Sequence, residues 1–268
     1  MRQNKTDDRD MVKAKKHLGQ HFLTDLSIAE RIAESLSVSQ NQVVEVGPGT
    51  GVLTQYLVKR PNIDLKVVEL DIESVEYLTA HYPELDQRIL YKDFLKMDMG
   101  DLFKTPFSLI GNFPYNISGP LFFKVFENRN QIPEVVGMLQ KEVAERIASG
   151  PGSKVYGVLS VLLQAFYDIE YLFTVEPHVF NPPPKVRSGV IRLIRKDNET
   201  IDCNEKLFVQ VVKAIFHHRR KAIRNSIKVI DFNREAIADH VYLTRRPEQM
   251  SVDDFIELTK MIESNPNV

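Results

Sequence analysis

Cysteine is almost absent from this chain of 268 residues, in which Cys203 is the only one. A single thiol cannot form a disulfide framework, and such usage is typical of a reducing cytosol. Residues 1–12 lack the apolar core of a signal peptide and the acid-poor character of a transit peptide, so we expect a disordered arm there. No apolar run approaches the length of a membrane span. We therefore expect a cytoplasmic protein without a membrane partner.

An excess of either charge is also lacking, because 35 Lys and Arg residues face 36 Asp and Glu residues, a net charge of −1. This balance argues against an indiscriminate polyanion binder, but it hides a polarised distribution. Residues 64–101 are rich in acids, whereas residues 213–228 contain no acid. A charge run is usually a solvated surface. The alternative is a phosphate-binding face, on which one helix would present Arg220 and Arg224 four residues apart.

A glycine-rich turn is the clearest feature that is present. The β-branched run at 43–46 stops at Gly47, Gly49 and Gly51, and an amphipathic segment over 52–58 follows. This order predicts a strand, a tight turn and a helix, with the backbone free to approach a ligand closely. A dinucleotide-binding turn would need a third glycine where Val52 stands. A turn that binds no ligand remains the alternative.

Two acids indicate what this turn would bind. Glu45 precedes the glycines, and a carboxylate there would repel a pyrophosphate but suit an ammonium or sulfonium group. A second apolar run, over 65–69, ends in Glu69, where a carboxylate can accept both ribose hydroxyls. The ligand implied is an adenosine without phosphates, and S-adenosylmethionine is the leading candidate.

The pattern along the chain predicts an α/β domain followed by helices. Apolar runs that alternate with helical segments favour a parallel sheet covered on both faces, and two later runs, 169–175 and 189–195, add an antiparallel pair. Thr24 or Asp25 would cap the first helix. After a polar linker near residues 196–204 the chain is helical, and Ser251 with Asp254 forms a capping-box pattern. The expected parallel strands cover residues 43–46, 65–69, 88–92, 107–110 and 134–139.

The fourth expected strand is followed by the tetrapeptide Asn112 to Tyr115, whose residue types indicate a chemical role. The Asn112 amide oxygen and the Phe113 carbonyl can accept both hydrogens of a planar amino group, and Pro114 fixes the chain so that they converge. Such acceptance localises the nitrogen lone pair and makes an aromatic amine nucleophilic. Tyr115 would stack on the ring. The alternative is an ordinary Pro-Tyr turn.

Eight motifs in order resemble one family, the KsgA (RsmA) ribosomal RNA adenine dimethyltransferases, over about residues 13–229. The motifs are GQHFL, VVEVGPGTGVLT, VVELD, KDFL, NFPYNIS, MLQKEVAERI, FNPPPKVRSGVIRL and FHHRRKAIRNS. The resemblance implies a class I S-adenosylmethionine-dependent methyltransferase, with a Rossmann-like seven-stranded sheet at 13–196 and a small all-α, rRNA-binding domain at 204–268. It further implies dimethylation of N6 in two adjacent adenosines of the hairpin near the 3′ end of small-subunit (16S) rRNA, and a role in late small-subunit biogenesis.

The resemblance also assigns residues. Phe180 would stack on the target base opposite Tyr115, so the catalytic set is Asn112, Phe113, Pro114, Tyr115 and Phe180. The family usually has Asn in place of His21 and Leu in place of Phe113. No metal is implied, and we expect a monomer that binds 16S rRNA in the small subunit or its precursor. With Glu45 added from its place before the glycines, the cofactor set is Gln20, His21, Leu23, Glu45, Gly47, Gly49, Gly51, Glu69, Asp93 and Asn112. The RNA-binding set is Arg219, Arg220, Lys221, Arg224 and Lys228.

Three rival functions remain open. One is the related methyltransferase that modifies an adenosine of large-subunit rRNA and confers macrolide resistance, which the FNPPPKVRSG and RRKAIRNS motifs disfavour. DNA adenine and protein glutamine methyltransferases usually carry NPPY instead of NFPY. An RNA-binding assembly or transcription factor without catalysis is the third, and the intact Glu69, Asp93 and Asn112 argue against it.

Overall fold

The structure is a computed structural model of the chain and describes residues 12–37, 41–198 and 200–267. The arm expected at residues 1–12 therefore lies outside the described residues, apart from Val12. The chain divides into two compact units, Met1–Ala144 with Glu170–Ile194 and Glu145–Ile169 with Arg195–Val268. Within the described ranges, every helix is too short or too polar to cross a membrane.

A seven-stranded sheet in the order β4-β3-β2-β5-β6-β9-β7 forms the centre of the first unit. Strands β2 to β6 pair in parallel, and β9 runs antiparallel to β6. Both the parallel sheet and its antiparallel addition were predicted. The strands are β2 (Gln42–Val46), β3 (Asp64–Glu69), β4 (Ile89–Tyr91), β5 (Ser108–Asn112), β6 (Glu134–Gln140), β7 (Tyr167–Val175) and β9 (Ser188–Arg195).

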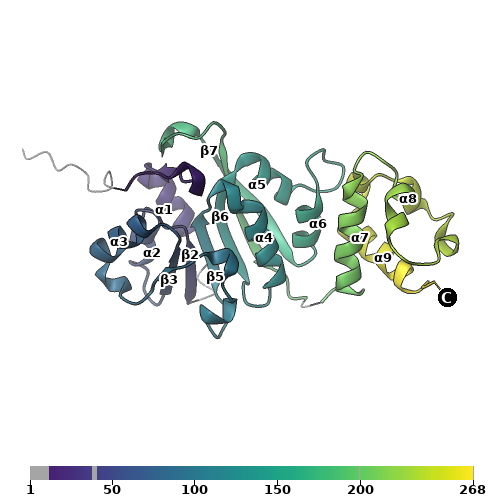
Figure 1. Cartoon of the computed structure of the whole chain (residues 1–268), viewed down its shortest axis with the longest axis horizontal. Coiled ribbons are helices and arrows are strands. Elements are labelled where there is room, and N and C mark those ends of the chain that lie inside the picture. The colour runs from purple at the N-terminus through teal and green to yellow at the C-terminus, as the bar shows by residue number, and fades with distance from the viewer. Residues whose placement is uncertain (1–11, 38–40, 199, 268) are drawn as a thin grey trace, which may run out of the picture. The chain divides into compact units, whose positions relative to one another are not determined.

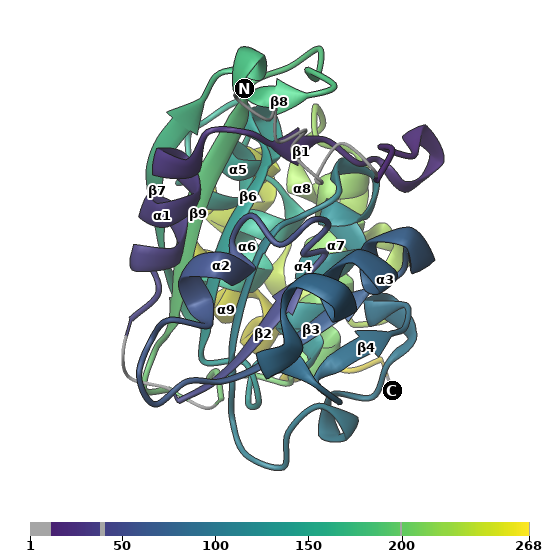
Figure 2. The same cartoon turned by 90° about the vertical axis from the view of Figure 1, so that its left-hand side faces the viewer.

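Helices lie on both sides of these strands (Figures 1 and 2). Strands β2, β5 and β6 are buried along nearly their whole length, as a parallel sheet covered on both faces requires. Asp25 caps α1, because its side chain accepts from Ser27 N at 2.9 Å and Ile28 N at 3.3 Å. The helices of this part of the chain are α1 (Leu26–Glu34), α2 (Thr54–Leu57), α3 (Ile72–His81), α4 (Ser118–Glu127) and α5 (Lys141–Ala148).

A second, two-stranded sheet was not predicted. Strand β1 (Phe22–Leu23) pairs antiparallel with β8 (Phe180–Asn181), and Thr24 N donates to Val179 O at 2.8 Å beside the pair. Strands of two residues carry no visible alternation of apolar and polar side chains. The pairing ties the segment before α1 to the loop between β7 and β9.

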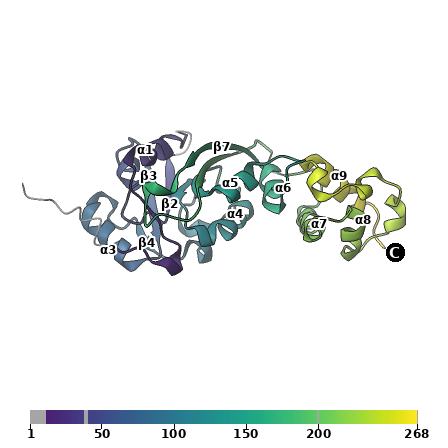
Figure 3. The ribbon, with the colours of Figure 1, turned by 90° about the horizontal axis from the view of Figure 1, so that it is seen from above.

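The second unit contains α6 (Val158–Gln164), α7 (Glu205–His217), α8 (Ile223–Ser226) and α9 (Val252–Glu263), of which α7 to α9 are clear in Figure 3. Residues 145–169, which include α6, group with these C-terminal helices. The ring of Tyr156, just before α6, meets Phe216 of α7 edge-on at 6.1 Å. The Ser251 capping box of α9 is confirmed, with reciprocal bonds of 2.9 and 3.0 Å to Asp254.

Short 3-10 turns fill several connections of the chain. They are Lys16–Leu18, Pro83–Leu85, Phe94–Lys96, Met99–Asp101, Tyr115–Ile117, Pro177–Val179, Ile227–Val229, Arg234–Ile237, Val241–Thr244 and Pro247–Gln249.

Candidate active site and cofactor cavity

A cavity of about 150 Å³ lies at the carboxyl ends of β2, β3 and β5, where an open α/β sheet places its ligands. The N-terminal segment supplies part of its wall. Most of the residues expected in the site meet here, although they lie far apart in the sequence. Those that line the cavity are Gln20, His21, Gly47, Gly49, Glu69, Asp93, Asn112, Phe113, Pro114 and Tyr115.

Neighbouring rings pack directly against the glycine turn because its glycines have no side chains. Gly49 has φ +57°, and a Cβ there would stand 2.8 Å from Phe22 Cε1. Gly51 does not line the cavity, and its Cβ would stand 2.5 Å from Tyr82 Cε2. Gly49 is therefore needed at the cavity wall, whereas Gly51 is needed for the packing of Tyr82.

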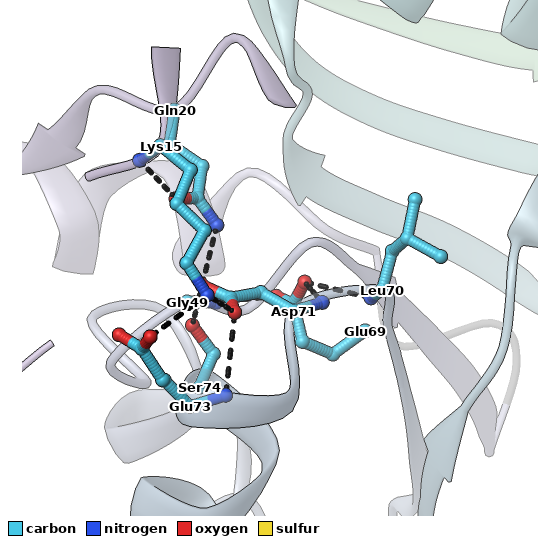
Figure 4. A network of polar contacts seen from close by, with 8 residues as sticks. All are labelled: Lys15, Gln20, Gly49, Glu69, Leu70, Asp71, Glu73 and Ser74. Carbon is cyan, nitrogen blue, oxygen red and sulfur yellow. Dashed lines mark hydrogen bonds and ion pairs between the residues drawn. The ribbon is translucent and has the colours of Figure 1, made fainter. Parts of the chain in front are cut away.

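Glu69 is held by three main-chain donors. Its Oε2 accepts from Gly49 N at 3.0 Å, and its Oε1 accepts from Leu70 N at 2.7 Å and Asp71 N at 2.9 Å (Figure 4). Burial raises the pKa of this carboxyl, against the opposing effect of these hydrogen bonds. The carboxyl therefore lies fixed in the cavity wall, where it can accept hydroxyl groups of a ligand.

Asp93 lies at the next strand end along the sheet. It follows β4, and its Oδ1 accepts from Leu95 N at 3.0 Å, which caps the 3-10 turn Phe94–Lys96. The cap orients a carboxylate that also lines the cavity. Glu69 and Asp93 together give this end of the cavity two acceptors, which fits a ribose and the amino edge of an adenine.

The orientation of the Asn112 amide is fixed by a main-chain acceptor. Asn112 Nδ2 donates to His21 O at 3.0 Å. A carbonyl oxygen can only accept, so the nitrogen must face His21 and the amide oxygen lies on the other side of the planar group. Phe113 N donates to Met138 O at 2.9 Å, which anchors the next peptide to β6. Two main-chain contacts thus hold the pair of expected acceptors.

The ring of Phe113 fills a pit made by two glycines that face each other on neighbouring strands. Gly111 of β5 pairs with Gly137 of β6. A Cβ on Gly111 would lie 2.8 Å from Phe113 Cε1, and a Cβ on Gly137 would lie 2.2 Å from Phe113 Cε2. Phe113 is 1% exposed, and its ring meets Phe122 edge-on at 6.0 Å. Only the main-chain carbonyl of Phe113 was expected to matter. Its side chain also matters, because the packing of the ring holds the tetrapeptide Asn112 to Tyr115 in place.

Tyr115 is tethered at its hydroxyl. Its Oη lies 2.6 Å from Ser188 Oγ, and its ring centroid lies 5.3 Å from that of His21. Burial raises the pKa of the Tyr115 phenol, so the hydroxyl stays protonated. His21 Nδ1 lies 2.8 Å from Pro182 O, and because that carbonyl only accepts, Nδ1 carries the hydrogen. His21 and Tyr115 thus form one anchored aromatic wall.

Glu45 does not line the cavity, so its expected role beside the ligand stays a prediction. It is 1% exposed, and Thr54 Oγ1 donates to its Oε2 at 2.7 Å. Burial raises the pKa of the Glu45 carboxyl to about 8. The side chain points from β2 toward α2, and the raised pKa reduces the share of the charged form that could attract a cation.

Leu23 and Phe180 also lie away from the cavity lining. They pair across the β1–β8 sheet, are each 3% exposed and belong to the core of the first unit. Stacking on a base requires an exposed ring face, so the role of Phe180 stays a prediction that needs local movement. The backbone of Leu23 is likewise committed to β8.

The expectation of one basic helix over residues 217–228 is wrong. Helix α7 ends at His217, Lys221 N donates to His218 O at 2.8 Å in a turn, and α8 begins at Ile223. Ile223 is fully buried, and its N–H donates to Arg245 O at 2.9 Å. Arg220 and Arg224 therefore do not share a helix face. Arg219 is half-buried and donates to Ser153 O at 3.2 Å, while the rest of the set, Arg220, Lys221, Arg224 and Lys228, is exposed.

Sequence reasoning missed several lining residues. Leu18, Phe22, Leu70, Lys92 and Asn116 all border the cavity. Phe22, Leu70, Lys92 and Asn116 lie within the motifs themselves, and Leu18 directly precedes one, so motif membership was the signal that could have found them. Within the described residues, no group of three His, Cys, Asp or Glu side chains is placed to hold a metal ion.

Comparison with known proteins identifies relatives over nearly the whole chain. The family model described as "Ribosomal RNA adenine dimethylase" matches residues 11–264. A protein of Bacteroides thetaiotaomicron named ribosomal RNA small subunit methyltransferase A is 56% identical, over 94% of this chain and 95% of its own. A Flavobacterium johnsoniae protein of the same name is 53% identical, over 96% of this chain and 98% of its own.

A solved structure shares the fold. The crystal structure of a dimethyladenosine transferase from Plasmodium falciparum matches with a TM-score of 0.75 at 23% identity, over 91% of this chain and 98% of that one. At this identity the likeness concerns the fold alone.

Proposed function

The chain belongs to the ribosomal RNA adenine dimethylase family, and from this premise we propose that Asn112 and Phe113 present acceptors to the N6 amino group of an extruded adenine. The protein is an S-adenosylmethionine-dependent methyltransferase that acts on adenine of ribosomal RNA. The cofactor supplies an activated methyl group when bound. The work left to the chain is therefore alignment and desolvation of the reacting atoms.

The hydrogen-bond acceptors that line the cavity suit this cofactor. Glu69 and Asp93 offer fixed carboxylates for the ribose hydroxyls and the adenine amino group, and a ligand without phosphates leaves these carboxylates unopposed by like charge. Gly47 and Gly49 expose their main chain at the cavity wall, between the two carboxylates and Asn112. The cofactor would therefore extend from the β3 and β4 ends toward β5.

The observation that carries the proposal is the bond from Asn112 Nδ2 to His21 O at 3.0 Å. It turns the amide oxygen away from His21, and this oxygen with the Phe113 carbonyl can accept both N6 hydrogens. Such acceptance draws the nitrogen toward a pyramidal geometry and localises its lone pair. Tyr115, held at Ser188, offers a ring face for the base.

Two transfers place different demands on the site. After the first, N6 keeps a single hydrogen, so one of the two acceptors loses its partner. The second transfer then depends more on aromatic stacking by Tyr115. The base must also leave its stack, which costs a few kcal/mol and is easier in a loop than in a duplex.

We further propose that the substrate is 16S rRNA in the small subunit or its precursor, that two adjacent adenosines are modified late in assembly in the cytoplasm, and that the protein acts as a monomer. The relatives that are 53–56% identical carry small-subunit names, which favours this substrate over large-subunit rRNA. The exposed cations Arg220, Lys221, Arg224 and Lys228 suit phosphate contacts.

The test is methyl transfer to separated ribosomal subunits. Purified protein is incubated with labelled S-adenosylmethionine and unmethylated small or large subunits, and the label is mapped by primer extension. We expect two adjacent adenosines of small-subunit rRNA to be modified. Label in large subunits alone would contradict the proposed substrate.

The matched variant is Asn112→Ala. Its transfer rate should fall at least about 100-fold, the scale seen when one preorganised polar group is removed from an active site. Calorimetry should still detect cofactor binding, because Glu69 and Asp93 are unchanged. Normal turnover by this variant would refute the assignment of Asn112.

A further inference from the structure

Asp71 receives more polar contacts than a helix cap needs. It is 2% exposed and caps α3, accepting from Glu73 N at 3.2 Å. Its Oδ1 also bonds the ammonium of Lys15, and its Oδ2 accepts from Gln20 Nε2 at 3.1 Å (Figure 4). The two contacts from Lys15 and Gln20 cross more than fifty residues of sequence and join the N-terminal segment to the end of β3.

Those two contacts close the segment Lys15–His21, which we call the strap. Gln20 Oε1 accepts from Lys15 N at 2.7 Å, so the amide of Gln20 is bound at both of its ends. Between them the 3-10 turn Lys16–Leu18 ends at Gly19, which has φ +67°. The inner side of the strap supplies Leu18, Gly19, Gln20 and His21 to the cavity wall.

Asp71 is also coupled to the carboxylate that lines the cavity. Its N–H donates to Glu69 Oε1 at 2.9 Å, so one short turn positions Glu69 on the cavity side and the strap on the other. Burial acts to raise the pKa of Asp71, but hydrogen bonds from Lys15 and Gln20 outweigh it and hold the pKa below its ordinary value. The carboxylate therefore stays charged, and the contact with Lys15 is an ion pair whose acid side chain is 0% exposed.

We propose that Asp71 is a positioning residue for the cofactor site, which latches the strap over the cavity through Lys15 and Gln20 and so limits the rate at which cofactor enters and leaves. The inference rests on the proposed function, because it takes the cavity to bind S-adenosylmethionine. Asp71 touches no reacting atom. It acts through Gln20, His21 and Glu69.

The variants separate the latch from the helix cap. Asn caps helices as well as Asp does, so Asp71→Asn keeps α3 capped while it removes the charge. Lys15→Met removes the partner charge and keeps most of the side-chain stem. Lys16→Met is the matched control, because Lys16 is an exposed neighbour on the same strap. Glu73→Gln removes the outer partner of Lys15, which lies at 3.1 Å and is half exposed.

The measurement is the rate at which labelled S-adenosylmethionine leaves the full-length protein in a chase with unlabelled cofactor. A hydrogen bond between charged groups is worth enough to change an equilibrium about tenfold or more. We expect Asp71→Asn and Lys15→Met each to release cofactor roughly tenfold faster, and the double variant to fall far short of the roughly hundredfold that independent effects would give. Glu73→Gln should have a smaller effect, since the pair is more exposed, and Lys16→Met none.

Two further readouts distinguish the latch from a loss of structure. The cofactor concentration for half-maximal transfer should rise with release, whereas the single-turnover rate at saturating cofactor should change less than about twofold. Hydrogen exchange of residues 12–23, measured without cofactor, should speed up in Asp71→Asn and Lys15→Met but not in Lys16→Met.

The outcomes separate the two proposals. If the unaltered protein binds no S-adenosylmethionine, the proposed function fails, while the exchange experiment still tests the latch. If the protein binds cofactor and Asp71→Asn releases it at the unaltered rate, the latch is wrong. Additive effects of Lys15→Met and Asp71→Asn would also overturn it, because two groups of one ion pair cannot act independently.

Discussion

The ring of Phe113 can be moved without substituting any residue that lines the cavity, by adding one methyl group to the neighbouring strand β6. In Gly137→Ala the new Cβ would stand 2.2 Å from Phe113 Cε2. Carbon atoms pack at about 3.5–4.0 Å, so the ring must retreat by about 1.3–1.8 Å. Phe113 carries one of the two proposed N6 acceptors. A displacement of about 1 Å in an active site costs on the order of 100-fold in rate, which is what we expect in single-turnover methyl transfer.

The Gly137→Ala variant should stay folded while it loses activity. Overpacking costs about 1–3 kcal/mol, which corresponds to a drop of roughly 2–12 °C in Tm for a chain of this size. Gly119→Ala is the control, because its Cβ would meet nothing within 4 Å. The second-site change Phe113→Leu should restore much of the rate to Gly137→Ala, since Leu is shorter than Phe. If folded Gly137→Ala transfers methyl groups as fast as Gly119→Ala, the seating of the tetrapeptide by Phe113 is refuted.

Three shorter predictions concern other parts of the molecule. Because the folded pKa of Glu45 is raised to about 8, this group should cost the protein stability on the order of 1 kcal/mol per pH unit as pH rises from about 5 to 8, and Glu45→Gln should reduce the slope in urea titrations by that amount while the share of Glu69 remains. An unchanged slope in the variant would exclude Glu45 as a source. Charge reversal at Arg220 and Arg224 should weaken binding to small subunits and flatten its salt dependence while calorimetry finds unchanged cofactor affinity; unchanged subunit binding would remove both from the RNA interface. Ser188→Ala should free the Tyr115 ring and slow the second methyl transfer more than the first, and equal slowing would contradict the stacking account.

The predictable part of the fold and site follows from local patterns with one topological rule. Valine-rich runs predicted β2 and β3. Polar residues at the ends of predicted strands indicated Glu69 after β3 and the tetrapeptide at Asn112 after β5. Since carboxyl ends of parallel strands share one edge of a sheet, these residues were expected to meet, and they line one cavity. The Asp25 and Ser251 caps were also predicted, because a cap depends only on residues within one turn.

The unpredicted part depends on partners distant in the chain. No residue near Phe180 in the sequence indicates that it pairs with Leu23 and enters the core. Likewise, no local pattern predicts that Thr54 donates a hydrogen bond to Glu45. The break between α7 and α8 has no glycine or proline to signal it. It follows from the burial of Ile223 and its bond to Arg245, which only the folded chain brings together.

The acceptor that orients Asn112 belongs to the main chain of residue 21, and this has a consequence for enzyme engineering. Any amino acid at position 21 supplies the same main-chain carbonyl, so every variant of a saturation library there keeps the acceptor that orients the Asn112 amide. What changes across such a library is the ring that faces Tyr115 at 5.3 Å. Position 21 is therefore the place to recontour the wall of the active site for altered purines.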